Sequence, residues 1–201
     1  EGKEEWLEAE NNPEEEIMTF RKLPFSKELY IEREDFQEEA NKKFFRLTLG
    51  TEVRLKNAYI IKGENVIKDA DGNITEIHAT YDLDSKSGSG TEASQRKVKG
   101  TIHWVSIPHA VEAEIRSFDR LLIVEDASEL GDDFMKFINP ESIHITQKAF
   151  VERSLRSANV NKAVQFIRKG YYCLDPDASP EKLVFNRTVT LKDTWAREQN
   201  K

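Results

Sequence analysis

The chain of 201 residues has a single cysteine, Cys173, and no apolar run long enough to cross a membrane. One cysteine cannot form an internal disulfide or a cysteine-rich zinc site, which favours a reducing, cytoplasmic location. The four histidines are scattered, without the close pairing that metal sites use. A secretory signal is not expected, because the first residues are acidic. The sequence therefore predicts a protein with no metal site and no membrane contact.

Motifs of catalytic chemistry are also missing. No glycine-rich phosphate loop leads into a helix, and no Gly-x-Ser-x-Gly nucleophile motif occurs. Residues 69–73, Asp-Ala-Asp-Gly-Asn, have the aspartates of a calcium loop, but the glycine and the final glutamate are not where such a loop needs them. We interpret this segment as a tight turn. The expectation is a binding module with no catalytic residues.

Charge is unevenly distributed. The formal net charge is -7, and residues 1–40 alone carry 14 acidic and 5 basic residues. Any surface for nucleic acid must therefore be local and must lie outside this acidic start. Residues 1–16 form a glutamate-rich lead-in that begins without methionine, and we expect the chain to be a piece of a longer protein.

The most informative stretch is residues 41–59, where apolar and basic residues alternate on both sides of Gly50. This alternation predicts two half-buried strands joined by a three-residue loop. The leucines and valine would then face the core, and Arg46, Arg54 and Lys56 would share an open outward face. Such a face suits phosphates and unstacked bases of single-stranded RNA. A merely solvated basic surface is the alternative, since surface strands commonly carry Lys and Arg.

Short strand patterns recur at spacings near ten residues, which favours a mainly β fold, either barrels or sandwiches, with few short helices. Residues 163–173 predict a strand, a turn at Lys169-Gly170 and a second strand. Residues 82–96 are rich in Ser and Gly and predict a flexible loop. Residues 126–138 predict a helix that ends before Asn139-Pro140.

Six segments, taken in order, closely resemble the C-terminal anticodon-binding region of bacterial-type glutaminyl-tRNA synthetase. The resemblance covers the chain from about residue 20 to residue 195, and six motifs in register are far more specific than any one. The segments are Val53-Arg-Leu-Lys-Asn-Ala-Tyr59, Lys97-Val-Lys-Gly-Thr-Ile-His-Trp-Val-Ser106, Asp119-Arg-Leu-Leu122, Ile138-Asn-Pro-Glu-Ser142, Gln165-Phe-Ile-Arg-Lys-Gly-Tyr-Tyr-Cys-Leu-Asp175 and Phe185-Asn-Arg-Thr-Val189.

The resemblance implies two β-barrels of a ribosomal-protein type, in regions 1–100 and 101–201, with strands that can be exchanged between them. It implies that Arg54, supported by Lys56, reads the first anticodon base, and that Arg46 reads the third. Gln165 and Arg168 would hold the central base, with Asn41 and Lys43 near the same loop. Lys43 and Phe45 stand where family members have glutamine and lysine, and the arginine that completes the central pocket is missing.

The resemblance also implies a role for the whole protein. The complete enzyme would join glutamine to its tRNA with ATP and Mg in a catalytic domain that this chain lacks. The chain itself would bind the anticodon loop as a monomer in the cytoplasm, without contacting DNA or a membrane and without a cofactor. The alternatives are a glutamyl-tRNA synthetase tail, an rRNA-binding barrel, or a protein-interaction domain that uses the acidic first 40 residues.

Overall fold

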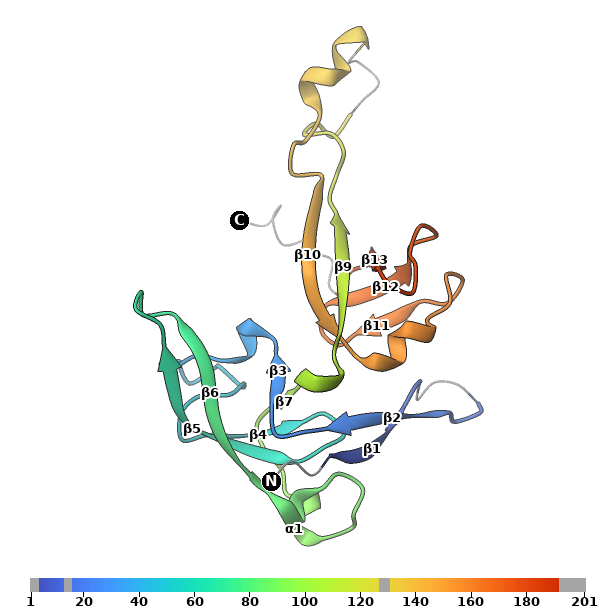
Figure 1. The fold of residues 1–201 in the computed structure, drawn as a ribbon. Coiled ribbons are helices and arrows are strands. Elements are labelled where there is room, and N and C mark those ends of the chain that lie inside the picture. Colours follow the sequence, from blue (N-terminus) through green and yellow to red (C-terminus); the bar gives the residue numbers. More distant parts are fainter. Residues whose placement is uncertain (1–3, 13–15, 127–130, 192–201) are drawn as a thin grey trace. The chain divides into compact units, whose positions relative to one another are not determined.

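The computed structural model describes residues 4–12, 16–126 and 131–191, and its chain divides into two compact units, Glu1–Ala110 and Val111–Lys201. Both are built mainly from strands, with short helical turns between them (Figure 1). The expected β-rich class with few short helices is therefore confirmed. Within these described residues, the strands form four open sheets rather than closed barrels, because the outer strands of each sheet do not pair with each other. The assignment of two regions to 1–100 and 101–201 stays a prediction.

The first unit contains three sheets. Its eight strands pair in the orders β1-β2, β3-β8 and β6-β5-β4-β7. Short helical turns η1 (Arg33–Asp35), η2 (Leu83–Ser85), α1 (Glu92–Gln95) and η3 (Ile107–His109) connect them. The strands are β1 (Glu5–Glu10), β2 (Phe20–Phe25), β3 (Leu29–Ile31), β4 (Glu52–Leu55), β5 (Ile60–Lys68), β6 (Ile74–Asp82), β7 (Thr101–Ile102) and β8 (Trp104–Ser106).

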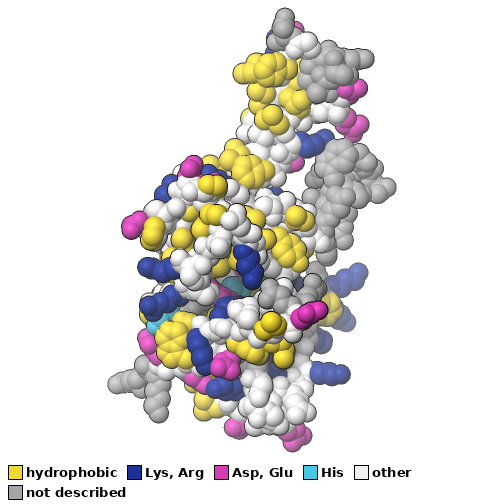
Figure 2. Space-filling model, turned by 90° about the vertical axis from the view of Figure 1, so that its right-hand side faces the viewer, with side chains coloured by type: hydrophobic (Ala, Val, Ile, Leu, Met, Phe, Trp, Pro, Cys, Tyr) yellow, Lys and Arg dark blue, Asp and Glu magenta, His cyan; other side chains and the backbone are white. Residues whose placement is uncertain are grey.

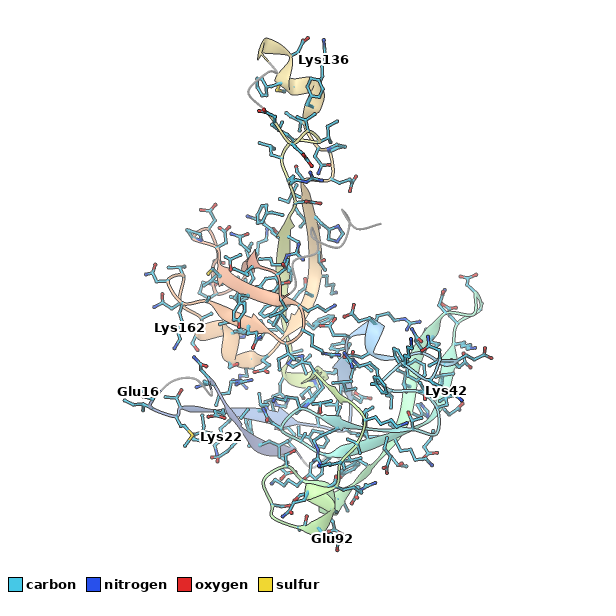
Figure 3. All side chains as sticks on the ribbon, turned by 180° about the vertical axis from the view of Figure 1, so that it is seen from behind. Glu16, Lys22, Lys42, Glu92, Lys136 and Lys162 are labelled. Atoms are coloured by element: carbon cyan, nitrogen blue, oxygen red, sulfur yellow. The ribbon has the colours of Figure 1, made fainter. Side chains whose placement is uncertain are left out.

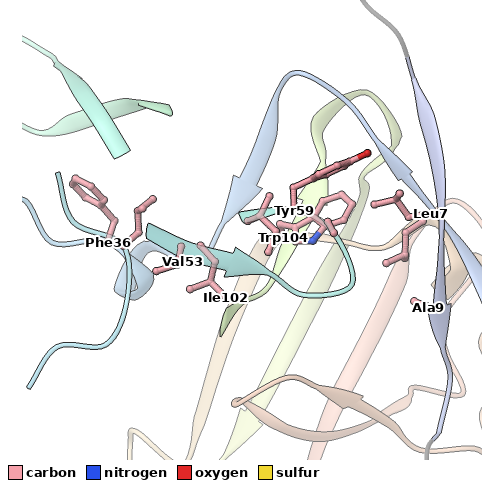
Figure 4. Close-up of a cluster of buried hydrophobic side chains, with 11 residues drawn as sticks. Leu7, Ala9, Phe36, Val53, Tyr59, Ile102 and Trp104 are labelled. Carbon is pink, nitrogen blue, oxygen red and sulfur yellow. The ribbon is translucent and has the colours of Figure 1, made fainter. Parts of the chain in front are cut away.

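The core of the first unit gathers one face of each of its sheets. Along β4, Val53 and Leu55 are buried whereas Glu52 and Arg54 are half-buried, which is the alternation that a strand with one core face requires. Figure 4 shows these core side chains together with Leu7 from β1 and Trp104 from β8. Residues far apart in the sequence therefore fix the position of β4.

The hairpin predicted for residues 41–59 is wrong. Both edges of β4 are already occupied, by antiparallel β5 on one side and by parallel β7 on the other. Leu47 instead bridges to Phe36 and Leu49 bridges to Gly63. The strand that returns along β4 is β5, through a turn in which Asn57 adopts a φ of 60°. Asparagine tolerates this left-handed conformation better than most residues.

The second unit contains one five-stranded sheet in the order β10-β9-β13-β12-β11, in which β13 runs parallel to β9 and the other pairs are antiparallel. Its core includes Phe185, Leu183 and Tyr172. The ring of Phe166 stacks on the ring of Tyr172, with 4.3 Å between the two ring centroids. The strands are β9 (Val111–Phe118), β10 (Ile143–Val151), β11 (Val164–Phe166), β12 (Gly170–Leu174) and β13 (Leu183–Val189).

The predicted hairpin at residues 163–173 is confirmed as β11 and β12, but the turn comprises residues 167–169, and Gly170 already belongs to β12. The helix predicted over 126–138 is described as the 3-10 helix η4 (Gly131–Phe137), and residues 127–130 lie outside the described part. A further 3-10 helix, η5 (Arg153–Ser157), follows β10. Residues 119–126 and 131–142, which lie between β9 and β10, form an arm that carries exposed apolar residues such as Phe134 and Met135. Figure 2 shows hydrophobic side chains at the top of its view.

Gly100 tests the packing around β4. Its backbone conformation would accept alanine, but an added Cβ would lie 2.2 Å from the carbonyl oxygen of Phe45. Gly100→Ala should therefore lower the free energy of unfolding by about 1–3 kcal/mol, as overpacking does. Urea denaturation measures the change, and Thr101→Ala on the exposed side of the same segment should have an effect within about 0.5 kcal/mol. Equal stability of Gly100→Ala and the wild type would show that this approach is not tight.

Asp175 tests the second unit through pH. Hydrogen bonds from the backbone of Asp177 and from Asn186, with the nearby charge of Arg116, hold the pKa of its carboxyl below the ordinary value. A carboxylate with a lowered pKa stabilises the fold fully above the unfolded pKa, and this contribution is lost as pH falls through the folded pKa. Asp175→Asn should therefore destabilise the protein at pH 7 and lose most of that effect well below pH ~4. Unfolding curves at several pH values check this, and a pH-independent difference would contradict it.

Candidate functional site

Arg54 on β4 is held by a segment that the sequence predicts as a flexible loop. Its Nη1 donates to the carbonyl oxygen of Ser85 at 2.9 Å and to Oγ of Ser87 at 3.3 Å. Its Nη2 donates to the carbonyl oxygens of Ser94 at 2.9 Å and Arg96 at 3.2 Å. The fork of the guanidinium therefore joins four points of one segment, which we call the covering loop (residues 82–96).

The covering loop has regular structure that its Ser/Gly-rich sequence did not predict. It contains η2 and the single helical turn α1, in which the Thr91 hydroxyl caps the helix by accepting from the backbone N of Ser94. Oγ of Ser85, which is fully buried, accepts from the backbone N of Ile60 at 2.8 Å and donates to the carbonyl oxygen of Asp82 at 2.6 Å. The open outward face expected beside Arg54 is thus covered in part by this loop.

Arg46 is held by a different kind of partner. Its Nε donates to a carboxylate oxygen of Asp35 at 3.1 Å, and the Asp35 side chain is 1% exposed. Its Nη1 donates to the carbonyl oxygen of Phe45 at 3.0 Å. Asp35 therefore fixes the direction of Arg46, and within the described residues Nη2 is the terminal nitrogen left to meet a ligand.

The remaining candidates of the first unit are exposed. Asn41 and Lys43 lie in a turn in which Oδ1 of Asn41 accepts from the backbone N of Lys43 at 2.9 Å. Lys56 follows β4, and its carbonyl oxygen accepts from the indole N–H of Trp104 at 2.9 Å while its side chain is exposed. Figure 3 labels Lys42, which lies in this turn between Asn41 and Lys43. The lysines can thus meet a phosphate without rearrangement.

One strand segment joins the two parts of this site. The Cα of Gly100 packs against the carbonyl of Phe45, and the carbonyl oxygen of Gly100 accepts from the backbone N of Arg54 at 2.9 Å. Phe45 and β4 therefore both contact this segment, which places Arg46 and Arg54 on neighbouring segments. The other candidates of the first unit flank these two along the chain: Asn41 and Lys43 precede Arg46, and Lys56 follows Arg54.

Gln165 and Arg168 lie together in the second unit. Gln165 is exposed on β11, and Arg168 is half-buried in the turn that leads to β12. The turn closes through a hydrogen bond from the backbone N of Lys169 to the carbonyl oxygen of Phe166 at 2.8 Å, and Arg168 adopts a φ of 65°. A left-handed arginine costs about 1–2 kcal/mol relative to glycine, and such strain is common at functional sites. The turn therefore fixes where the Arg168 backbone directs its side chain.

No sequence pattern pointed to two residues that contribute to this site, Asp35 and Arg96. Asp35 is a single carboxylate among many, so nothing in the sequence distinguishes it from its exposed neighbours. Arg96 forms ion pairs with Glu52 and, at 3.0 Å, with Asp82. The hydrogen bond that Arg96 donates to the carboxylate of Glu52 raises the pKa of Arg96, which keeps it charged. The Ser-rich composition around Arg96 favoured a flexible loop and so concealed its role.

Other chemistry has little support in the described part of the chain. Among the described residues, no group of three or more His, Cys, Asp or Glu side chains is placed to hold a metal ion. The phenol of Tyr59 has a raised pKa because it is buried and donates to Glu5 at 2.5 Å, so it remains protonated. Within the same residues, no helix is long and apolar enough to span a bilayer. The arrangement can donate hydrogen bonds and positive charge to a ligand.

Arg54 should be the residue that orders the covering loop. Arg54→Lys keeps the charge, but one ammonium cannot reach the acceptors of Ser85, Ser94 and Arg96 together. We expect faster hydrogen exchange across residues 88–96, measured by mass spectrometry. Lys56→Arg is the matched control, since the Lys56 side chain is exposed, and its exchange should equal that of the wild type. Unchanged exchange in Arg54→Lys would show that the loop is held without the fork.

Both units of the chain are similar to known proteins. Residues 1–82 and residues 101–175 each match a family model described as the anticodon-binding domain of class I (E and Q) tRNA synthetases. The chain is 54% identical over 194 residues to a glutamine-tRNA ligase of Proteus mirabilis and 52% identical over 203 residues to one of Rhodopirellula baltica. A glutamine-tRNA ligase of Shigella boydii is 53% identical over 197 residues.

These alignments cover 96%, 100% and 98% of this chain, but only 34%, 33% and 35% of the three relatives. The chain thus spans about a third of the length of the curated relatives that it matches, and it corresponds to their C-terminal part. The β-rich units, the clustered donors and similarity over the whole chain agree. The chain belongs to the anticodon-binding domain family of the class I glutamate and glutamine tRNA synthetases, and it is the anticodon-binding region of the glutaminyl form.

Proposed function

We propose that this chain recognises the anticodon loop of glutamine tRNA. The observation that carries the proposal is similarity of more than 50% identity, over nearly the whole chain, to glutamine-tRNA ligases, within a family described as anticodon-binding. The site supports it, because exposed lysines and oriented arginines occur on neighbouring segments of one unit and an exposed amide occurs beside Arg168 in the other. Such donors match the phosphates and base edges of an unpaired RNA loop.

In the first unit, Lys43 and Lys56 act as point charges for phosphates, and Asn41 shapes the turn that carries Lys43. Arg46, directed by Asp35, offers a nitrogen to the third anticodon base. Arg54 reads the first base after it exchanges partners in the covering loop for acceptors on the RNA. Bidentate contacts of this kind provide about 1–3 kcal/mol of discrimination in duplex readout.

In the second unit, Gln165 and Arg168 hold the central base. The amide of Gln165 can donate and accept at one base edge, which is the pattern needed to tell bases apart. The strained turn at Arg168 presents the guanidinium from a fixed backbone position rather than from a flexible loop. Rigid presentation lowers the ordering cost of binding.

The activity of the whole protein is part of the same proposal. Relatives named glutamine-tRNA ligase are about three times as long as this chain, so the joining of glutamine to tRNA with ATP and Mg would occur in the region that this chain does not match. We propose that the chain contributes recognition only, as a monomer in the cytoplasm, and that DNA is not its ligand. No step of the chemistry is assigned to its residues.

Protein contact is a second candidate, favoured by the exposed apolar side chains of the β9–β10 arm. Large exposed apolar patches often mark such contacts. Among the RNA-binding alternatives, a glutamyl-tRNA synthetase tail is less well supported, because the three relatives compared above are all glutaminyl enzymes. An rRNA-binding module would bind glutamine tRNA stem-loops with different anticodon bases equally well.

Binding to the glutamine tRNA anticodon stem-loop, with each anticodon base changed in turn, tests the proposal by fluorescence anisotropy. The wild-type chain should prefer the native loop, and Gln165→Ala should reduce discrimination at the central base roughly 5- to 150-fold. Lys43→Ala is the contrast: affinity should fall for every loop alike, and the salt dependence should lose about one ion. Equal affinity of the wild type for all loops would reject base reading, and absence of binding at low salt would favour protein contact.

A further inference from the structure

The two arginines of the first unit differ in what holds them. Arg46 is bound to a buried carboxylate, whereas the four acceptors of Arg54 are three backbone carbonyl oxygens and one hydroxyl, all neutral. Hydrogen bonds between an arginine and an anionic oxygen are roughly twice as strong as bonds between neutral groups. The partners of Arg54 can therefore be replaced by a phosphate or a polar base edge far more readily than Asp35 can be replaced at Arg46.

The covering loop is held in two different ways along its length. Its inner half, residues 83–87, is tied to the sheet: the backbone N and Oγ of Ser87 donate to the carbonyl oxygen of Ala58 at 2.9 and 2.7 Å, and Ser85 holds Ile60. The outer half, residues 88–96, begins with Gly88 and Gly90, which adopt φ values of 81° and 78° and have no neighbouring atom within 4 Å of where a Cβ would lie. These glycines allow the outer half to move while the inner half stays in place.

Few contacts fasten this outer half. Arg54 holds the carbonyl oxygens of Ser94 and Arg96, and Thr91 donates to the carbonyl oxygen of Asp84 at 2.5 Å. The backbone N of Ser89 donates to the carbonyl oxygen of Lys86 at 3.2 Å, and α1 lies against η2. The side chain of Arg96 adds a charged link, because it bridges Glu52 on β4 and Asp82 at the start of the loop. The side chains of Arg96, Glu52 and Asp82 are each more than a third exposed, so each ion pair is weak. Figure 3 shows Glu92, in α1 of this half, at the outer boundary of the unit.

We propose that the outer half of the covering loop is a displaceable cover over Arg54 and that Arg96 is the residue that keeps it closed. The inference rests on the proposed function, because the competing ligand is the unpaired RNA loop. RNA acceptors and the loop carbonyls compete for the same guanidinium. Arg96 therefore controls affinity by setting how much of the binding energy is used to open the cover, and it is a positioning residue rather than a contact residue.

Loss of the Arg96 charge should change RNA affinity in the direction opposite to the usual one. Removing a positive charge from an RNA-binding surface ordinarily weakens binding, since fewer phosphates are neutralised. If Arg96 fastens the cover, Arg96→Gln should instead tighten binding, because opening the cover becomes easier. Exposed ion pairs of this kind correspond to a roughly two- to tenfold change in affinity when two are lost together.

The experiment measures binding of the 201-residue chain to the native glutamine tRNA anticodon stem-loop by fluorescence anisotropy. Arg96→Gln should bind two- to tenfold more tightly than the wild type. Lys22→Gln is the matched control, since it also removes one positive charge and one exposed ion pair, with Glu8 at 2.5 Å, on the acidic hairpin β1-β2. It should bind as the wild type does or slightly more weakly. Weaker binding of Arg96→Gln would overturn the proposal and make Arg96 a direct contact.

Hydrogen exchange supplies the second readout and separates the two proposals. The bonds of Gln95 to Thr91 and of Arg96 to Ala93 protect amides in the outer half. These amides should exchange faster in free Arg96→Gln and, in the wild type, faster when RNA is bound than when it is absent. Discriminating RNA binding with unchanged or slower exchange would overturn the cover and leave the proposed function intact. Equal binding of all anticodon variants would reject both.

Discussion

The position of Arg54 depends on β4 being enclosed on both edges. Its backbone is paired with β5 and β7, and its apolar face contributes Val53 and Leu55 to the core. Only the polar face remains for function, and the covering loop lies on that face because Arg54 supplies donors for its carbonyl oxygens. The guanidinium of Arg54 therefore holds the covering loop and also belongs to the surface that we propose binds RNA.

An arginine whose N–H donors are all bonded within the protein can still recognise a ligand when the oxygens that accept those bonds are neutral. Desolvating a guanidinium is costly, so a half-buried arginine needs partners in the free protein. Carbonyl oxygens meet that need without neutralising the charge, and the site keeps its attraction for an anionic ligand. Arg46 shows the other solution, in which a buried carboxylate fixes the geometry and one nitrogen remains for the ligand. The two arginines therefore suit different tasks: exchange at one and orientation at the other.

The second unit places its candidates by a local device. Gln165 and Arg168 are three residues apart on one hairpin, so their proximity follows from the turn and needs no distant segment. A charge network, in which Arg116 pairs with Glu114 at 2.6 Å and with Asp175 at 3.2 Å, links β9 to the residue that follows β12. It stabilises the sheet on which the hairpin lies and is separate from the residues that the proposal assigns to RNA.

The sequence by itself determined the β-rich class, the hairpin at residues 163–173, the family, and which residue types could meet RNA, because strand alternation, turn residues and family motifs are local patterns. It did not determine the partner of residues 45–49, since Leu47 and Leu49 could alternate along any neighbour and only the filled edges of β4 directed them to Phe36 and Gly63. Nor did it reveal the partners of Arg46 and Arg54. Asp35 is 11 residues from Arg46, and Ser94 is 40 residues from Arg54. Tertiary folding alone brings such distant donors and acceptors within hydrogen-bonding reach.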